Sequence, residues 1–188
     1  MNVYARAVKT LAPGFLIATP QLFDSNFERA VILLIEHSSA GSMGLVINRT
    51  APLTFRDLAR SQELTVHNSR RDHALHHGGP VEPYRGFVLH DSQRIEERNE
   101  LFPGLYLSVT GDALSPLLLD ESANMRFCLG YAGWGPGQLE KELKQGSWLF
   151  TDADPRVVLR EEPAQIWAHT IKSMGIDPGW LVASGGVN

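Results

Sequence analysis

The residues best suited to chemistry lie in two short stretches, Glu36–His37 and Asn48–Arg49. A carboxylate beside an imidazole can move protons, and a guanidinium can hold an anion through two parallel hydrogen bonds. The two stretches come from two predicted strands, and because these strands should pair, their polar ends are expected to converge at one edge of the sheet. Two interpretations stay open: a site for an anionic ligand or substrate, or a structural network in which Glu36 pairs with Arg49 and Asn48 caps a turn.

A second candidate site lies in the sequence GYAGWGPGQLEKEL, residues 130–143, where an apolar strand passes through a glycine-rich turn into a helix. Unpaired N–H groups at a helix N-terminus favour an anion. The residues that would line this site are Trp134, Gly135, Gly137 and Gln138. The turn lacks the Lys and the Ser or Thr of a nucleotide-binding loop. The alternative is that the glycines allow a tight corner, Trp134 covers the core, and Gln138 or Glu140 caps the helix.

Several histidines raise the question of a metal site. They are His73, His76, His77 and His90, the last followed by Asp91. Adjacent histidines on an extended segment face opposite sides, and the spacing of the others does not align their imidazoles. We therefore predict no metal and no other cofactor.

The nucleophilic side chains are also better explained by structure. Cys128 lies in the apolar strand sequence RFCLGYA, where burial as a small hydrophobic residue is expected. Ser38, Ser39 and Ser42 are close to His37 in sequence, but no GxSxG turn and no acid partner supports a hydrolase. No catalytic residue is assigned.

The candidate sites depend on a central hairpin. Residues 30–37 form an apolar, β-branched run typical of a buried strand, residues 45–47 form its partner, and Gly41 and Gly44 bracket the turn. Further strands are predicted at 15–18, 87–90, 105–109, 125–131 and 147–151, and helices at 54–59, 112–119, 137–145, 155–159 and 163–174. Residues 61–77 are predicted to be irregular. Strands mixed with short helices indicate an α+β domain with a mostly antiparallel sheet.

The composition fits a single domain over residues 1–188, with 43% hydrophobic and 20% charged residues. The longest aliphatic run, Ala30 to Ile35, is far shorter than the roughly 20 residues of a membrane helix. The apolar run in the N-terminal segment is too short for a secretory signal. Because Cys128 is the only cysteine, nothing suggests an oxidising compartment, and a cytoplasmic location with no membrane contact is expected.

The charge balance argues against a protein that coats nucleic acid. The formal net charge is −4, and the acidic residues are concentrated in the second half of the chain. The basic side chains that could still form a local DNA-binding patch are Arg56, Arg60, Arg70 and Arg71. Direct nucleic-acid binding therefore stays as a weaker alternative.

Several motifs occur together in one order along the chain. They are GFLIATP (14–20), FERAVILLIEH (27–37), GSMGLVINR (41–49), GGPV (78–81), RGFVLH (85–90), GYAGWGPGQLEKEL (130–143), SWL (147–149) and MGID (174–177). With these motifs the chain resembles the YqgE/AlgH family of bacterial proteins, often described as transcriptional regulators without an established biochemical activity. The resemblance implies a cytosolic α+β fold whose bifurcated sheet curls into a partial barrel flanked by short helices. One departure is that Thr50 and Ala51 precede Pro52, where family members commonly have proline directly after the Asn–Arg pair.

These observations favour a non-enzymatic regulatory or interaction protein that binds a small anionic ligand or a protein segment. The groove would lie between the hairpin and Trp134. The first alternative is an enzyme that acts on an anionic substrate with Glu36, His37 and Arg49, and the second is a regulator that binds DNA directly. Convergence of those three side chains in one pocket would favour the enzyme, and an exposed basic face would favour the DNA-binding protein.

Overall fold

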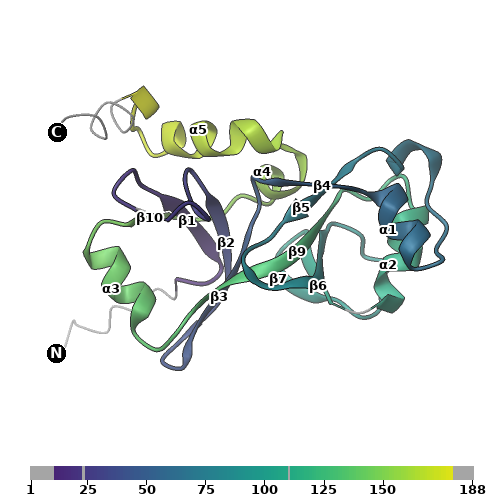
Figure 1. Ribbon diagram of the computed structural model, residues 1–188, viewed down its shortest axis with the longest axis horizontal. Helices are drawn as coiled ribbons and strands as arrows, with labels where there is room; N and C mark the ends of the chain where they lie inside the picture. Colours follow the sequence, from purple (N-terminus) through teal and green to yellow (C-terminus); the bar gives the residue numbers. More distant parts are fainter. Residues whose placement is uncertain (1–10, 23, 110, 180–188) are drawn as a thin grey trace, which may run out of the picture.

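The computed structural model describes residues 11–22, 24–109 and 111–179 (Figure 1). The strands in these ranges are β1 (Gly14–Ala18), β2 (Val31–Ser38), β3 (Gly41–Val46), β4 (Thr50–Thr54), β5 (Ala74–His77), β6 (Val81–His90), β7 (Asn99–Phe102), β8 (Leu105–Ser108), β9 (Met125–Trp134) and β10 (Trp148–Thr151). The helices are α1 (Phe55–Ser61), α2 (Gly111–Leu119), α3 (Gln138–Lys144), α4 (Pro155–Arg160) and α5 (Pro163–Ser173), with a 3-10 turn at Asn68–Arg70. No helix in the described part of the chain is both long and apolar enough to cross a bilayer.

Strand β9 is the branch point of the sheet. Its C-terminal part pairs antiparallel with β3, while its N-terminal part pairs antiparallel with β6 on one side and parallel with β5 on the other. The main path runs β10-β1-β2-β3-β9-β6-β8-β7, and β4 joins through β5. Figure 1 shows the two arms diverging, one towards α3 and α5 and the other towards α1 and α2. The predicted α+β class with a curled, bifurcated and mostly antiparallel sheet is confirmed.

Two adjacent glycines allow the sheet to split at β9. A Cβ on Gly78 would lie 2.3 Å from the carbonyl oxygen of Gly130, and one on Gly79 would lie 2.1 Å from the carbonyl carbon of Tyr131. The backbone can approach β9 this closely only because neither residue carries a side chain. The GGPV motif therefore marks the branch of the sheet.

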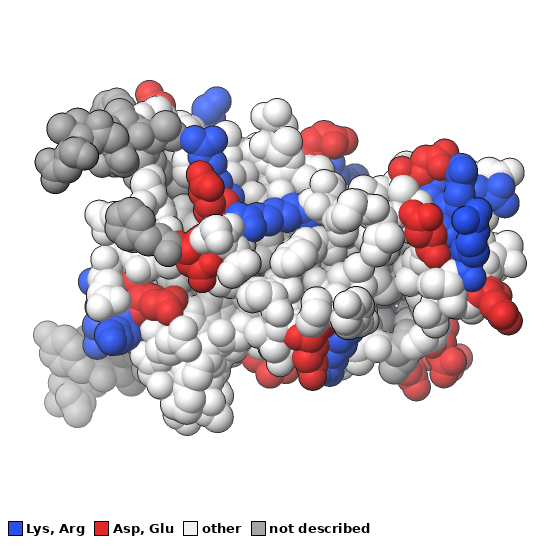
Figure 2. Space-filling model, viewed as in Figure 1, with Lys and Arg blue, Asp and Glu red and all other residues white. Residues whose placement is uncertain are grey.

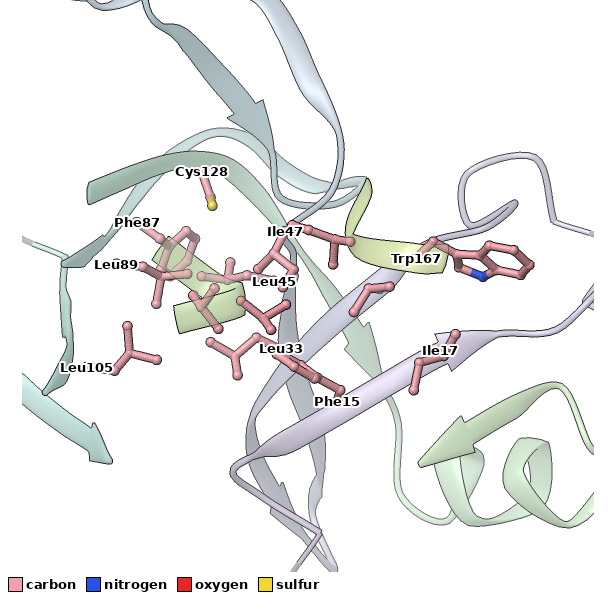
Figure 3. Close-up of a cluster of buried hydrophobic side chains, with 14 of the residues drawn as sticks. Phe15, Ile17, Leu33, Leu45, Ile47, Phe87, Leu89, Leu105, Cys128 and Trp167 are labelled. Carbon is pink, nitrogen blue, oxygen red and sulfur yellow. The ribbon is translucent and has the colours of Figure 1, made fainter. Parts of the chain in front are cut away.

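Strand β1 is buried on both faces, so it contributes to two hydrophobic clusters. Phe15 and Ile17 face the main cluster beneath α4 and α5, shown in Figure 3, and Leu16 faces a second cluster beneath α3. Cys128 lies fully buried in the main cluster, and burial raises the pKa of its thiol to about 12. The predicted role of Cys128 as a small core residue is confirmed. A third cluster packs α1 and α2 against β6 and β9.

The boundaries of three elements differ from the sequence predictions. Gly44 lies inside β3 rather than in the turn. The position requires glycine, because a Cβ there would lie 2.6 Å from the Cγ2 atom of Ile32 on the paired strand. The strand predicted to end at Tyr131 continues to Trp134. Residues 61–77, predicted to be irregular, include β5, whose pairing with β4 and β9 compensates for its polar sequence.

Candidate functional site

The four polar residues of the hairpin lie at its two opposite ends. Glu36 pairs with Met43 and His37 with Ser42 near the tight turn, whereas Asn48 follows the end of β3 at the open end. In an antiparallel hairpin the residue after the second strand lies beside the residues before the first strand, not beside those at its end. The prediction that Glu36, His37, Asn48 and Arg49 converge at one edge was therefore wrong.

Asn48 and Arg49 hold the loop that precedes β2. Asn48 accepts a 2.8 Å hydrogen bond from the N–H of Val31 and donates one of 2.8 Å to the carbonyl of Arg29. Arg49 donates from Nη1 to the carbonyl of Asn26 at 2.5 Å and from Nη2 to that of Glu28 at 2.7 Å. The expectation that Asn48 stabilises a turn is confirmed. The expected Glu36–Arg49 ion pair does not form, because the two residues lie at opposite ends of the hairpin.

Glu36 borders a groove of about 450 Å³ between the tip of the hairpin and β9. Its lining residues are Glu36, Ser38, Ala40, Gly41, Ser42, Met43, Val81, Tyr131, Gly133 and Trp134. Gly133 lines the groove beside Tyr131 and Val81, since a Cβ there would lie 3.4 Å from the Tyr131 ring and 3.9 Å from the Val81 side chain. We call this surface the hairpin groove. It is mainly apolar, and the described residues that line it include a carboxylate but no Lys or Arg.

His37, Ser42 and Trp134 belong to the opposite face of the hairpin. Cross-strand partners share a face of a sheet, so Glu36, Met43 and Gly133 face the groove, while His37 and its partner Ser42 face α3. His37 Nδ1 lies 2.8 Å from Ser42 Oγ. Its Nε2 lies 3.8 Å from a carboxylate oxygen of Glu140 on α3. The acid partner is one that sequence reasoning missed, because Glu140 is remote in the chain.

The contacts run from Ser42 to His37 to Glu140, which is the order in which a nucleophile, a base and an acid contact one another in a hydrolase. Ser42 is only 9% exposed, and although it is among the residues that line the groove, its hydroxyl bonds His37 on the face towards α3. A substrate in the hairpin groove would therefore not meet its hydroxyl. The three side chains join the hairpin to α3, and their geometry gives no support to a hydrolase.

Trp134 is fixed by a carboxylate that it shares with a second tryptophan. The Nε1 atoms of Trp134 and Trp148 donate to the same oxygen of Glu142, at 2.9 and 2.8 Å. The two rings pack edge to face, with centroids 5.8 Å apart. Trp134 is 6% exposed and therefore serves the core, although it borders the groove where β9 ends.

The turn after Trp134 is closed by its own side chain. Gln138 accepts a 3.0 Å hydrogen bond from the N–H of Gly135 and donates one of 2.9 Å to Glu142. Gly137 has a φ of 70°, the left-handed region that favours glycine. Gln138 thus occupies the Gly135 donor that an anion would have used, and the carboxylate of Glu142 lies next to it. The expected capping of the helix by Gln138 or Glu140 is wrong, because no side chain in the described part of the chain caps the N-terminus of α3 and Gln138 closes the preceding turn instead.

The buried histidines are held in structural networks. His76 Nε2 accepts a 2.8 Å hydrogen bond from Arg126 Nη1. Burial, and then the charge of Arg126, lower the pKa of His76 to about 4, so the ring is neutral. His90 Nε2 lies 3.0 Å from Ser108 Oγ, and burial lowers its pKa too. In the described ranges, no three or more His, Cys, Asp or Glu side chains are grouped as a metal site.

Arg126 is a buried structural residue that sequence reasoning missed. Its guanidinium donates to the carbonyls of Ile47, Val158 and Glu161, and so joins β3, β9 and α4. Desolvation lowers its pKa, and only 4% of the residue is exposed. A single Arg inside an apolar strand sequence was the signal that could have identified it.

A second groove, of about 610 Å³, lies at the open end of the hairpin. Its lining residues are Arg29, Asn48, Pro163, Ala164, Trp167, Ala168, Pro178 and Gly179. The guanidinium of Arg29 lies over the Trp167 ring, 5.6 Å from its centroid. We call this surface the Arg29 groove. No local sequence pattern indicates this groove, because its walls come from segments more than a hundred residues apart.

The basic residues near α1 do not form a continuous positive face. Arg70 is 6% exposed and donates to the carbonyls of Asp120 and Ala123, and Arg56 pairs with Asp72 at 2.6 Å. Figure 2 shows Lys and Arg gathered at this end of the molecule with Asp and Glu beside them. Of the proposed DNA-contacting residues, Arg70 is therefore unable to reach a phosphate.

Comparisons with known proteins agree on one family. The model of the family described as AlgH-like matches residues 15–179. A UPF0301 protein of Myxococcus xanthus is 56% identical over 96% of this chain and 100% of its own length, and one of Paracoccus denitrificans is 40% identical over 94% and 96%. The solution structure of the AlgH protein from Pseudomonas aeruginosa has a TM-score of 0.74 and 34% identity, covering 97% of this chain and 98% of that one. The chain belongs to the AlgH-like family, as its motifs predicted, and none of these names states a reaction or a ligand.

Proposed function

We propose that this member of the AlgH-like family is a cytosolic interaction protein with a regulatory role, and that it binds an apolar segment of a partner protein in the hairpin groove. The observation that carries the proposal is the place of Gly133 in the lining of the groove. The missing side chain leaves an open apolar recess between Tyr131 and Val81, with the Glu36 carboxylate at its border. The regulatory role rests on the family resemblance.

The chemistry of the groove favours a protein segment over a small anion. Met43, Val81 and Tyr131 offer apolar surface, and Glu36 would repel an anion but attract a Lys or Arg. Tyr84, which is 95% exposed, lies three residues after Val81 on the bulged strand β6. Exposed aromatic residues beside a recess are typical of protein-binding surfaces. The partner segment should therefore carry an apolar anchor next to a basic residue.

The two alternatives have less support. An enzyme built on Glu36, His37 and Arg49 needs all three in one pocket. Arg49 instead donates its hydrogen bonds to backbone carbonyls at the other end of the hairpin. Direct DNA binding would depend on Arg60 and Arg71 beside the seven-residue helix α1. Regulation of transcription through a protein partner fits the surface better than contact with DNA.

Selection from a library of random peptides tests the proposal. Peptides enriched on the wild-type protein should share a large apolar residue next to Lys or Arg. They should fail to bind Gly133→Leu, whose side chain fills the recess, and should bind Glu36→Gln about tenfold more weakly because a charged contact is lost. Enrichment of acidic peptides, or equal binding to Gly133→Leu, would overturn the proposal.

A further inference from the structure

We infer that the Arg29 groove is a second binding site, which takes a small anion carrying a planar ring. The inference goes beyond the proposed partner site, because the hairpin groove lies at the other end of the hairpin and contains a carboxylate instead of a cation. Its volume of about 610 Å³ falls within the range of small-molecule sites.

Arg29 supplies the charge that an anionic ligand requires. Its guanidinium stacks on Trp167 at the border of the groove, and no carboxylate of the described residues forms an ion pair with it. A guanidinium has five N–H donors in a planar fork that matches a carboxylate or phosphate.

The backbone of Arg29 is held in an unusual conformation. Its φ is 51°, in the left-handed region that long side chains rarely adopt. Such a conformation persists only where the surroundings hold it in place. The Asn48 side chain binds the carbonyl of Arg29, and Arg49 binds the carbonyls of Asn26 and Glu28. Asn48 and Arg49 are therefore positioning residues for Arg29.

The wall beside the charge is apolar, and its tryptophan is held in place. Trp167 is 7% exposed, and its Nε1 donates a 3.3 Å hydrogen bond to the carbonyl of Ala18, which fixes the ring. Ala164 and Ala168 line the groove with small side chains on the same helix, α5. A flat ring can lie along this wall while its carboxylate or phosphate reaches Arg29. A charged compound without a ring would lose the apolar contact.

Calorimetric titration of the full chain with two matched pairs of probes tests this inference. The pairs are 2-naphthoate with 2-naphthamide, and adenosine monophosphate with adenosine; each pair differs in the anionic group. In at least one pair the anion should bind about tenfold more tightly than its neutral counterpart, and Arg29→Gln should abolish this preference. Arg29→Lys should retain part of it, because the charge is kept without the planar fork.

Two control variants test whether the preference for the anionic probe belongs to the Arg29 groove. Arg60→Gln removes an exposed arginine on α1 and should leave the preference unchanged, as should Gly133→Leu in the hairpin groove. Thermal unfolding of Arg29→Gln checks that the variant is folded. Equal binding of the anionic and neutral probes, or a preference that survives in Arg29→Gln, would overturn the inference.

Discussion

The side-chain amide of Asn48 donates a 2.8 Å hydrogen bond to the carbonyl of Arg29, while its oxygen accepts one from the N–H of Val31. One side chain thus closes the open end of the hairpin and holds the residue that faces the second groove. Arg49 adds two bonds to the same loop, at Asn26 and Glu28. The stability of the hairpin and the placement of Arg29 are therefore coupled.

Asn48→Ala should lower the free energy of unfolding by about 1–3 kcal/mol, because it leaves the N–H of Val31 without a partner. Urea unfolding measures the loss. Asn68→Ala, which removes an exposed amide, should change stability by less than about 0.5 kcal/mol. Equal stability of Asn48→Ala and the wild type would show that the bonds of Asn48 contribute nothing to the hairpin.

Glu142→Ala should release both tryptophans that share its carboxylate. The N–H groups of Trp134 and Trp148 would each lose an acceptor, at a cost of about 2 kcal/mol in total. Urea unfolding measures this loss, and the near-ultraviolet circular dichroism of the tryptophans should change as well. Lys141→Ala, which changes an exposed residue on the same helix, is the control and should have little effect. An unchanged aromatic spectrum in Glu142→Ala would contradict the shared contact.

The buried imidazole of His76 should make stability depend on pH. Its pKa is about 4 in the folded protein, because of burial and Arg126, against 6.5 for the ordinary side chain. The unfolded chain therefore binds more protons between these values, so the contribution is complete above the unfolded pKa and is lost as the pH falls towards the folded one.

Between about pH 7.5 and pH 5 the wild type should lose about 2 kcal/mol more stability than His76→Gln, which has no titrating ring. Urea unfolding of both proteins at the two pH values measures the difference. Parallel losses in the two proteins would mean that His76 is not held neutral by its surroundings.

Cys128 should be unreactive in the folded protein. Its side chain is fully buried, and burial raises its pKa to about 12, so both access and thiolate formation are suppressed. Iodoacetamide should label it only after denaturation, as mass spectrometry can show. Labelling of the native protein at the rate of a free thiol would place Cys128 outside the core.

The fold was predictable where the signal was local. The β-branched run at residues 30–37 predicted a strand and residues 54–59 and 155–159 predicted helices from neighbouring residues, and the structure has a strand or a helix at each. The prediction that Gly44 belongs to a turn was wrong because a long-range contact requires this glycine: a side chain there would clash with Ile32 on the neighbouring strand.

The candidate site was predictable only in part. Glu36 and Trp134 do border one groove, but strand pairing places His37 on the face opposite Glu36 and Arg49 at the other end of the hairpin. Arg29 escaped notice because its role depends on contact with Trp167, which is remote in sequence. Long-range pairing decides such contacts, and no local pattern records it.

The most direct test of the account is the affinity of the Gly133 series for a peptide enriched by the wild-type protein. Gly133→Ala should weaken binding only slightly, because its Cβ makes an ordinary contact with the Tyr131 ring at 3.4 Å, whereas Gly133→Leu should abolish it. Fluorescence anisotropy of a labelled peptide gives the dissociation constants, with Arg29→Gln as the variant that should bind like the wild type. If Gly133→Leu bound the peptide as tightly as the wild type, the hairpin groove would not be the partner site.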